Sequence, residues 1–312
     1  MKNQIFICII LTCLLASCAT DFNDNLSVEQ QNPIDYESTE TQFTSEDGTV
    51  YFTGASNCTG DGSYVFDEDK VLEALVIPTT LPEVLDLSSF LPPIGDQGRQ
   101  GSCVSWAATY YLKSFQEHLE SGDLSYNPDN IMSPAYTYNQ ITMGTCEGTS
   151  FENTLDLLID KGAISLESFP YSDSSCNIQP TGNQDLEAEP NKMSDYKYLS
   201  GDNMVLEMKT LLNNQTPVLI STFLDSEFGK TDENGLTKYQ EHDVDYDVEG
   251  VCHAMLVVGY SNENNAFKVV NSWGQAWGDN GFVWIDYAAF DNVTDDTAGF
   301  RVISSAIVAY DL

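Results

Sequence analysis

The sequence predicts an α+β protein of two lobes, a helical lobe followed by an antiparallel, β-barrel-like lobe. Between Val104 and Leu119, apolar residues recur every three or four positions, which indicates an amphipathic helix. The runs 218–223 and 254–260 are instead short and β-rich, as buried strands are. The 312 residues suffice for one large domain or two small ones. A cleft between two such lobes is a natural place for a site built from both.

The first residues have the pattern of a targeting segment. Lys2 supplies a positive charge, and 5–15 is an apolar run of 11 residues, too short to span a membrane. The letters L-A-S-C that end at Cys18 resemble a bacterial lipobox. We therefore expect a lipoprotein signal peptide at 1–17, lipid on Cys18, and a chain anchored in the bacterial cell envelope. The alternative is an ordinary secretory signal cut near Ala16, and either form leaves the cytoplasm.

The stretch 18–80 is expected to be an acidic tether or lead-in. Residues 19–82 carry 13 acidic residues against one basic residue, Lys70, and show little periodicity. A short inhibitory pro-segment is the alternative interpretation of the same stretch. Across the whole chain, 48 acidic and 12 basic residues leave a net charge of −36, which argues against binding to nucleic acid or to an anionic membrane surface.

One globular domain is expected over 81–312, and its helical half comes first. Ser102 lies at the N-cap position of the long helix, and Gly122 supplies its stop. Ser150 opens a further helix that Gly162 ends. Other expected elements are short helices at 128–132 and 133–138, an acidic loop at 180–190 and a helix at 202–212.

The β half follows from residue 218 onward. Strands are expected at 218–223, 254–260, 267–271, 281–286 and 302–310. Turn residues at 261–265 and 279–281 separate three of them as hairpins would. A mostly antiparallel sheet is therefore predicted for the second lobe.

Five cysteines remain in the expected mature chain, namely Cys58, Cys103, Cys146, Cys176 and Cys252. Because five is odd, at least one stays unpaired or pairs between chains. Catalysis is one reason for an exported protein to keep a free thiol.

Cys103 is the candidate nucleophile because it lies in the first turn of the long helix. Unpaired N–H groups and the helix dipole favour negative charge there, so we expect this thiol to ionise readily. The alternative is a small buried side chain with only a packing role.

His253 is the candidate base among three histidines. His118 is expected on the exposed side of its helix, and His242 in a solvated acidic loop. His253 instead stands at the mouth of an apolar strand. Asn271 ends another strand, where its amide can hold an imidazole ring, and Trp273 two residues later can shield that bond from water.

These motifs together resemble the papain family of cysteine proteases. The stretch Q-G-R-Q-G-S-C at 97–103, the triplet C-H-A at 252–254 and the tetrapeptide N-S-W-G at 271–274 occur in the family's order. The turn F-P-Y at 169–171 and the strand entry T-P-V at 216–218 add to the likeness, which covers roughly 81–312. The resemblance implies the two-lobed papain fold and a cysteine-type peptidase that cuts proteins or peptides.

The family's roles carry over by position. The resemblance makes Cys103 the thiolate nucleophile, His253 its ion-pair partner, and Asn271 the residue that orients the imidazole. Gln97 donates to the oxyanion together with the backbone N–H of Cys103. For Gly148, Thr149, Ala254 and Trp273, the resemblance implies contact with substrate.

The chain departs from the family in several places. Gln100 stands where the family has a cysteine, so the usual bridge to the turn at 146–149 cannot form, and we expect Cys146 to pair with Cys176 instead. Val104 replaces the tryptophan next to the nucleophile, and Thr149 a glycine. The family's long helical propeptide has no counterpart between 18 and 83.

The resemblance implies no metal or organic cofactor, and we expect a monomer. Two other functions fit the same fold, an amidase acting on cell-wall peptides and a binding protein without catalysis. The amidases usually lack the N-S-W-G element, and a binding protein need not keep all four of Cys103, His253, Asn271 and Gln97.

Overall fold

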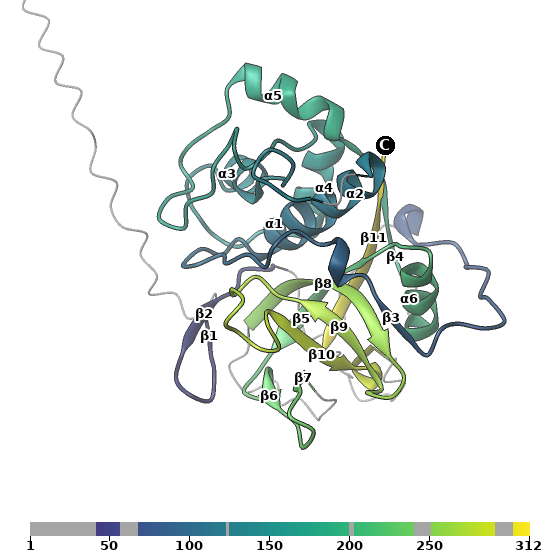
Figure 1. Ribbon diagram of the computed structural model, residues 1–312. Coiled ribbons are helices and arrows are strands. Elements are labelled where there is room, and N and C mark those ends of the chain that lie inside the picture. Colours follow the sequence, from purple (N-terminus) through teal and green to yellow (C-terminus); the bar gives the residue numbers. More distant parts are fainter. Residues whose placement is uncertain (1–41, 57–67, 123–124, 200–202, 240–250, 291–301) are drawn as a thin grey trace, which may run out of the picture. The chain divides into compact units, whose positions relative to one another are not determined.

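A computed structural model describes residues 42–56, 68–122, 125–199, 203–239, 251–290 and 302–312 (Figure 1). The described residues belong to one compact unit, 33–312. The helices α1 to α5 gather on one side of this unit, and strands β5, β8, β9 and β10 on the other (Figure 1). The fold is the predicted α+β type, with a helical lobe packed against a sheet.

The helical lobe is built around the chain that follows Cys103. It begins as α1 (Cys103–Ser105), continues as a π-helical stretch (Trp106–Lys113) and ends as α2 (Ser114–Ser121). Gly122 ends it at φ 64°, a left-handed conformation that glycine adopts without strain. Beside it lie α3 (Pro134–Thr142), α4 (Phe151–Asp160) and the short α5 (Gly182–Ala188). The predicted long helix is present, with a wider middle section than expected.

The second lobe is one mixed sheet in the order β4-β11-β5-β8-β9-β10-β7-β6, with β3 also pairing with β8. Its central strands β5 (Val218–Leu224), β8 (Val251–Ser261) and β9 (Ala266–Val270) are antiparallel neighbours and almost wholly buried. The helix α6 (Met204–Asn213) packs on β5 and β8. The remaining strands are β3 (Val84–Asp86), β4 (Met193–Tyr198), β6 (Lys230–Thr231), β7 (Thr237–Tyr239), β10 (Phe282–Asp286) and β11 (Ile303–Asp311). Among the described strand pairs of this sheet, only β10 with β7 is parallel.

Most element predictions are confirmed, two are wrong, and the strand β4 was not predicted. The expected helix at 128–132 is a turn, because the N–H of Asp129 and the backbone around it bond to the side chains of Asn127 and Asn130. The loop expected at 180–190 contains α5, which Thr181 and Gln184 start with a capping box. The strand β4 was missed, since its alternating burial becomes visible only beside β11.

Before the globular domain, residues 42–56 pack against it. A two-stranded hairpin, β1 (Gln42–Thr44) and β2 (Val50–Phe52), is followed by an extended stretch to Ser56. We call residues 51–56 the 51–56 segment. Part of the stretch expected as a tether is therefore ordered, and its contacts are described with the site.

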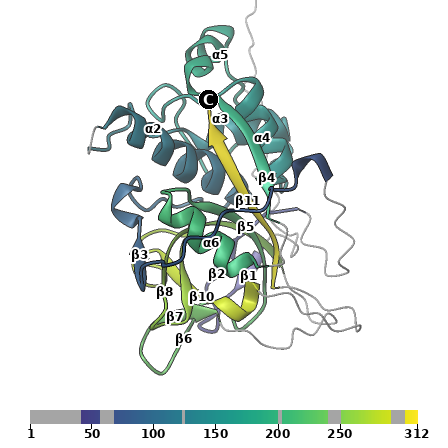
Figure 2. The same cartoon turned by 90° about the vertical axis from the view of Figure 1, so that its right-hand side faces the viewer.

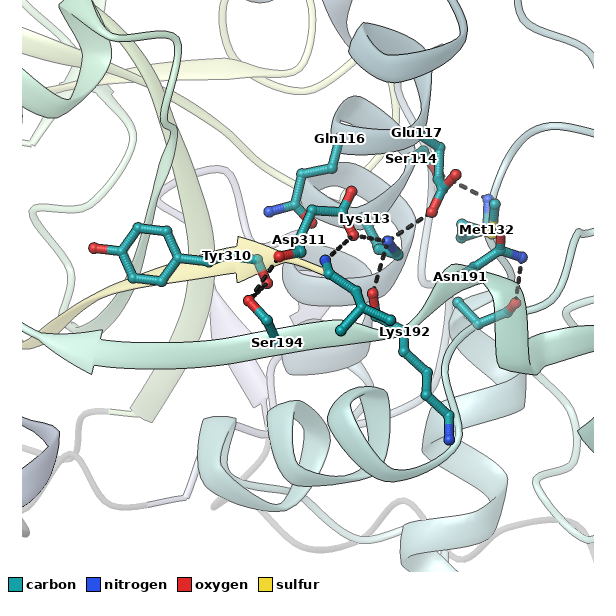
Figure 3. A network of polar contacts seen from close by, with 12 residues as sticks. Lys113, Ser114, Gln116, Glu117, Met132, Asn191, Lys192, Ser194, Tyr310 and Asp311 are labelled. Carbon is teal, nitrogen blue, oxygen red and sulfur yellow. Dashed lines mark hydrogen bonds and ion pairs between the residues drawn. The ribbon is translucent and has the colours of Figure 1, made fainter.

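A buried lysine joins the two lobes. Figure 2 shows β11 running from the sheet up to the helices, beside β4. At its end, Asp311 forms an ion pair with Lys113 of the long helix, and Lys113 also pairs with Glu117 at 2.6 Å (Figure 3). The lysine side chain is 1% exposed. The helix that carries Cys103 and the sheet that carries His253 are thus connected by charge as well as by packing.

Within the described part of the chain, no helix is both long enough and apolar enough to cross a membrane.

Candidate active site

Cys103 opens the long helix at the junction of the two lobes. It is fully buried, and it is the free cysteine of the described residues. Ser102 occupies the N-cap position as predicted, but its side chain does not cap the helix. Its hydroxyl is instead 2.7 Å from that of Tyr171, which lies in the F-P-Y turn. The turn therefore braces the start of the nucleophile's helix.

His253 and Asn271 come together from neighbouring parts of the sheet. His253 is the third residue of β8, and Asn271 directly follows β9, the antiparallel neighbour of β8. The His253 Nε2 atom is 2.7 Å from the Asn271 Oδ1 atom, so Nε2 carries the proton in this bond. The other ring nitrogen, Nδ1, is buried without a hydrogen-bond partner in the described structure. Nδ1 is thus the atom left to exchange a proton.

Trp273 covers the histidine. Its ring stacks on the His253 ring with centroids 4.7 Å apart and an interplanar angle of 30°. With Trp273 5% exposed and Asn271 1% exposed, water does not reach the bond between the imidazole and the amide.

Gln97 is held in one orientation by contacts at both ends of its amide. Its Oε1 atom accepts a hydrogen bond from the Ser272 hydroxyl at 2.6 Å. Its Nε2 atom donates to the Gln100 carbonyl at 2.8 Å and to the Thr53 carbonyl at 3.3 Å. Ser272 was not singled out in the sequence, where only its place within N-S-W-G could have indicated it. The arrangement fixes an amide donor that already bonds to the Thr53 carbonyl oxygen, and a fixed donor of this kind is what an oxyanion hole requires.

In this conformation the expectation that Cys103 ionises readily is wrong. Burial raises the pKa of the Cys103 thiol to about 12, although backbone hydrogen bonds from Ala254, Val104 and Ala55 lower it. Burial likewise lowers the pKa of His253 to about 4, against the hydrogen bond with Asn271, which raises it. The exclusion of water changes the Cys103 pKa more than the helix N-terminus does, so the thiol and the imidazole are both neutral in this conformation.

The 51–56 segment causes part of this burial by lying across the site. The Trp273 indole N–H donates to the Phe52 carbonyl at 2.7 Å, and Tyr51 stacks on the Trp273 ring at 4.6 Å. The carbonyl of the next residue, Thr53, accepts a hydrogen bond from the Gln97 side-chain amide. Beyond it, the N–H groups of Gly54 and Ala55 both donate to the Cys252 carbonyl, at 3.3 and 3.2 Å.

The residues expected to bind substrate are occupied by this segment. The Thr149 N–H donates to the Gly54 carbonyl, and the Thr149 carbonyl accepts from the Ser56 N–H, both at 2.8 Å. A Cβ atom on Gly148 would lie 3.0 Å from the Gly54 carbonyl carbon, so a glycine there permits the close approach. Ala254 bonds through its backbone to the Cys103 sulfur instead.

The expected pairing of Cys146 with Cys176 is confirmed. Cys252 is also disulfide-bonded. Since Cys103 is free and the other two described cysteines pair with each other, the partner of Cys252 lies outside the described residues.

Of the other histidines, His118 is not exposed as expected. Only 6% of it is exposed, because its ring stacks on Tyr126 with centroids 4.5 Å apart. His242, Cys18 and Cys58 lie outside the described residues. Over the described ranges, no group of three or more His, Cys, Asp or Glu side chains is placed to hold a metal ion.

Chemically, the site offers a thiol, a proton acceptor fixed by an amide, and a second amide that can stabilise a negative oxygen. This set can carry out nucleophilic attack on a carbonyl and protonation of a leaving group. It needs access to a substrate, which the 51–56 segment denies in this conformation.

The papain family cysteine protease model matches residues 81–296 of the chain. Among curated relatives, cathepsin K of Gallus gallus is 26% identical over 199 residues, which are 62% of this chain and 55% of the relative. A cathepsin L-like peptidase of Aedes aegypti is 31% identical over 201 residues, 61% of this chain and 54% of the relative. The chain thus spans about half the length of these relatives.

Solved structures support the same fold. Xylellain, a cysteine protease from Xylella fastidiosa, aligns with 80% of this chain and 94% of its own at a TM-score of 0.64 and 19% identity. Digestive procathepsin L 3 of Tenebrio molitor larval midgut aligns with 78% of this chain and 74% of its own, at a TM-score of 0.57 and 18% identity.

Proposed function

Because the chain belongs to the papain family of cysteine proteases, we propose that it hydrolyses peptide bonds with Cys103 as nucleophile. His253 takes the thiol proton at Nδ1 and passes it to the leaving amine, while Asn271 keeps the imidazole in the required tautomer. Gln97 stabilises the oxygen that becomes negative. The substrates are proteins or peptides, and the active chain is a monomer.

The single observation that carries this proposal is the fixed Gln97 amide. A carbonyl oxygen, that of Thr53, already lies 3.3 Å from the Gln97 Nε2 atom, and the Ala254, Val104 and Ala55 backbones bond to the Cys103 sulfur. A peptide carbonyl can therefore take the place that the reaction demands. A protein with only a binding role would not need this donor held at both ends.

The test is hydrolysis of a peptide library by the exported chain after treatment with a thiol reductant. Cys103→Ala must abolish cleavage, and Gln97→Ala is expected to lower kcat about 10²- to 10³-fold. Ser105→Ala is the matched control, since it removes a buried hydroxyl without a hydrogen-bond partner from the same helix. Cleavage by Cys103→Ala would show that Cys103 is not the nucleophile, and an equal loss in Ser105→Ala would mean that the loss comes from damage to the helix.

We further propose that the chain is attached to the bacterial envelope through lipid on Cys18. The proposal rests on the charge, the apolar run and the L-A-S-C pattern of the N-terminus. Metabolic labelling with a fatty acid should mark the wild-type chain and leave Cys18→Ala unmarked. An unlabelled wild-type chain found in the medium would instead support the simple secretory signal.

A further inference from the structure

We propose that the cavity around His118, near the end of the long helix, binds a guanidinium cation, either the side chain of an arginine residue or a small free guanidine. His118 lies in α2, and Cys103 opens the same continuous helix. At about 1.5 Å of rise per residue, the two are roughly 20 Å apart. The cavity therefore forms no part of the site that holds Cys103, and the inference goes beyond the proposed peptidase activity.

The cavity is small, with buried apolar walls and an exposed acidic rim. Its volume is about 260 Å³. Met132 and Ile164 supply buried apolar side chains to its lining, whereas Asp129 and Glu187 are exposed. Sites for drug-sized ligands measure roughly 300–1,000 Å³, so this cavity suits a single side chain or a molecule of that size.

The His118 imidazole is a buried polar group of this cavity that lacks a hydrogen bond. Only 6% of His118 is exposed, and within the described structure neither of its ring nitrogens has a hydrogen-bond partner. Its ring stacks on Tyr126 with centroids 4.5 Å apart and meets Phe90 edge-on at 6.4 Å. In a neutral imidazole one nitrogen is an acceptor. Because a buried acceptor without a partner is unfavourable, a ligand that donates a hydrogen bond to it gains affinity.

The cavity is also negatively charged. Among the described residues that line it, Glu117, Asp129 and Glu187 carry carboxylates, and none is a lysine or an arginine. Lys113 neutralises Glu117 only in part, because Asp311 shares the same ammonium group (Figure 3). Burial raises the pKa of Glu117 above its ordinary value, and Asp311 adds to the rise, although Lys113 lowers it. A cation in the cavity would therefore meet negative charge that the protein leaves uncompensated.

The rim of the cavity is held in place before any ligand arrives. The Ser168 hydroxyl donates to the Glu187 Oε1 atom, which leaves the other carboxylate oxygen for a ligand. The Asn191 Nδ2 atom donates to the Ala163 carbonyl at 2.8 Å, which leaves the Asn191 Oδ1 atom as a further acceptor in the lining. A rim fixed in this way loses little conformational entropy on binding.

The acceptors and rings favour a guanidinium over other cations. In the part of the chain that the structure describes, no three His, Cys, Asp or Glu side chains are placed to hold a metal ion. A guanidinium carries five N–H donors in one plane, which suits acceptors on separate walls such as His118 and Glu187. It also stacks on aromatic rings, and Tyr126 lines the cavity. An ammonium group concentrates its charge at one point and does not stack in this way.

The experiment titrates guanidines into the full-length chain and follows binding by ligand-observed NMR. The background is Cys103→Ala, so that no probe is hydrolysed and the result does not depend on peptidase activity. The probes are N-acetyl-arginine N-methylamide, which represents an arginine residue within a chain, n-butylguanidine, which represents a small free guanidine, and N-acetyl-lysine N-methylamide. We expect the blocked arginine to bind with a Kd of about 1 mM or less and the blocked lysine to bind at least about threefold more weakly.

Two variants test the cavity itself. His118→Phe keeps the ring that stacks on Tyr126 but removes both nitrogens, so it should leave Tm almost unchanged and weaken binding of the blocked arginine about tenfold. Glu187→Gln should weaken binding about threefold. Its matched control is Glu233→Gln, which removes the same charge from the exposed turn between β6 and β7 and should leave the Kd unchanged.

Each outcome decides a point. Tighter binding of the blocked arginine than of n-butylguanidine would assign the cavity to an arginine residue, and the reverse order would assign it to a small free guanidine. Equal affinity for the blocked lysine would overturn the assignment to a guanidinium. The absence of binding by either guanidine up to about 10 mM, or an unchanged Kd in both His118→Phe and Glu187→Gln, would overturn the site.

Discussion

Replacing Lys113 with methionine tests whether the charge that joins the two lobes stabilises the fold. Lys113 has three ammonium protons, and three acceptors surround them, namely carboxylate oxygens of Asp311 and Glu117 and the Lys192 carbonyl at 3.3 Å (Figure 3). The lysine side chain is 1% exposed, and the two carboxylate side chains are 20% and 22% exposed. Methionine fills most of the same space but leaves both carboxylates facing each other.

The expected loss of unfolding free energy is about 3 kcal/mol, at the lower end of the range for breaking a buried ion pair, because water reaches part of each carboxylate. For a domain of this size that corresponds to a fall of about 6–12 °C in Tm. Lys161→Met is the matched control, since its partner Asp185 is 3.3 Å away and its side chain is 36% exposed. An exposed pair of this kind contributes about 0–1 kcal/mol.

The pH dependence gives the prediction a second check. Burial raises the pKa of Glu117 above its ordinary value of 4.5, Lys113 lowers it, and Asp311 raises it. Removing Lys113 must raise this pKa further, so the folded variant binds a proton that the unfolded chain releases. Stability of Lys113→Met should therefore fall, relative to wild type, as pH rises from about 4 toward neutrality.

The assay is thermal unfolding by circular dichroism over that pH range. A difference between Lys113→Met and wild type no larger than that of Lys161→Met would refute the reasoning. A difference in stability that grows as the pH is lowered would also refute it, since protonated carboxyls carry no charge for a lysine to neutralise.

Three further predictions concern the site and its support. Cys146→Ser should lower the unfolding free energy by about 3–4 kcal/mol, because the disulfide to Cys176 closes a separation of 30 residues, and an unchanged urea midpoint would contradict this. Asn271→Ala should lower kcat for peptide hydrolysis about 10²-fold because the imidazole loses its 2.7 Å bond, and equal kcat values for the variant and the wild type would show that the bond does not orient His253. Alkylation of Cys103 should stay slow and rise about tenfold per pH unit between about pH 5 and about pH 8 without levelling off, since burial raises its pKa to about 12 and only the thiolate reacts, whereas a plateau within that range would mean that water already reaches the thiol.

The residues of the site could be named from the sequence because each stands in a local pattern. The helix after Cys103 is evident from apolar spacing, and the strands that carry His253 and Asn271 are evident from their β-branched runs. The order of the three motifs then identifies the family. Long elements with a regular apolar pattern can be predicted from their own residues, because that pattern already decides which side chains will be buried. The confirmed bounds of α4 and β5 show this.

Other elements could not be predicted locally, because their stability comes from distant partners. The strand β4 needs β11 beside it, and the His118 ring is buried by Tyr126. Ser272 acquires its role only when Gln97, 175 positions away, meets it across the two lobes. Tertiary contacts override weak local preference at such positions.

The sequence by itself therefore determined the helix of Cys103, the strands of His253 and Asn271, and the papain family. Only the tertiary structure decided that residues 51–56 lie across these groups and that the thiol and imidazole are neutral beneath them. The physical reason is that pKa values depend on which groups exclude water, and that exclusion arises here from the contacts of Gln97, Trp273 and Thr149 with a segment far away in the chain.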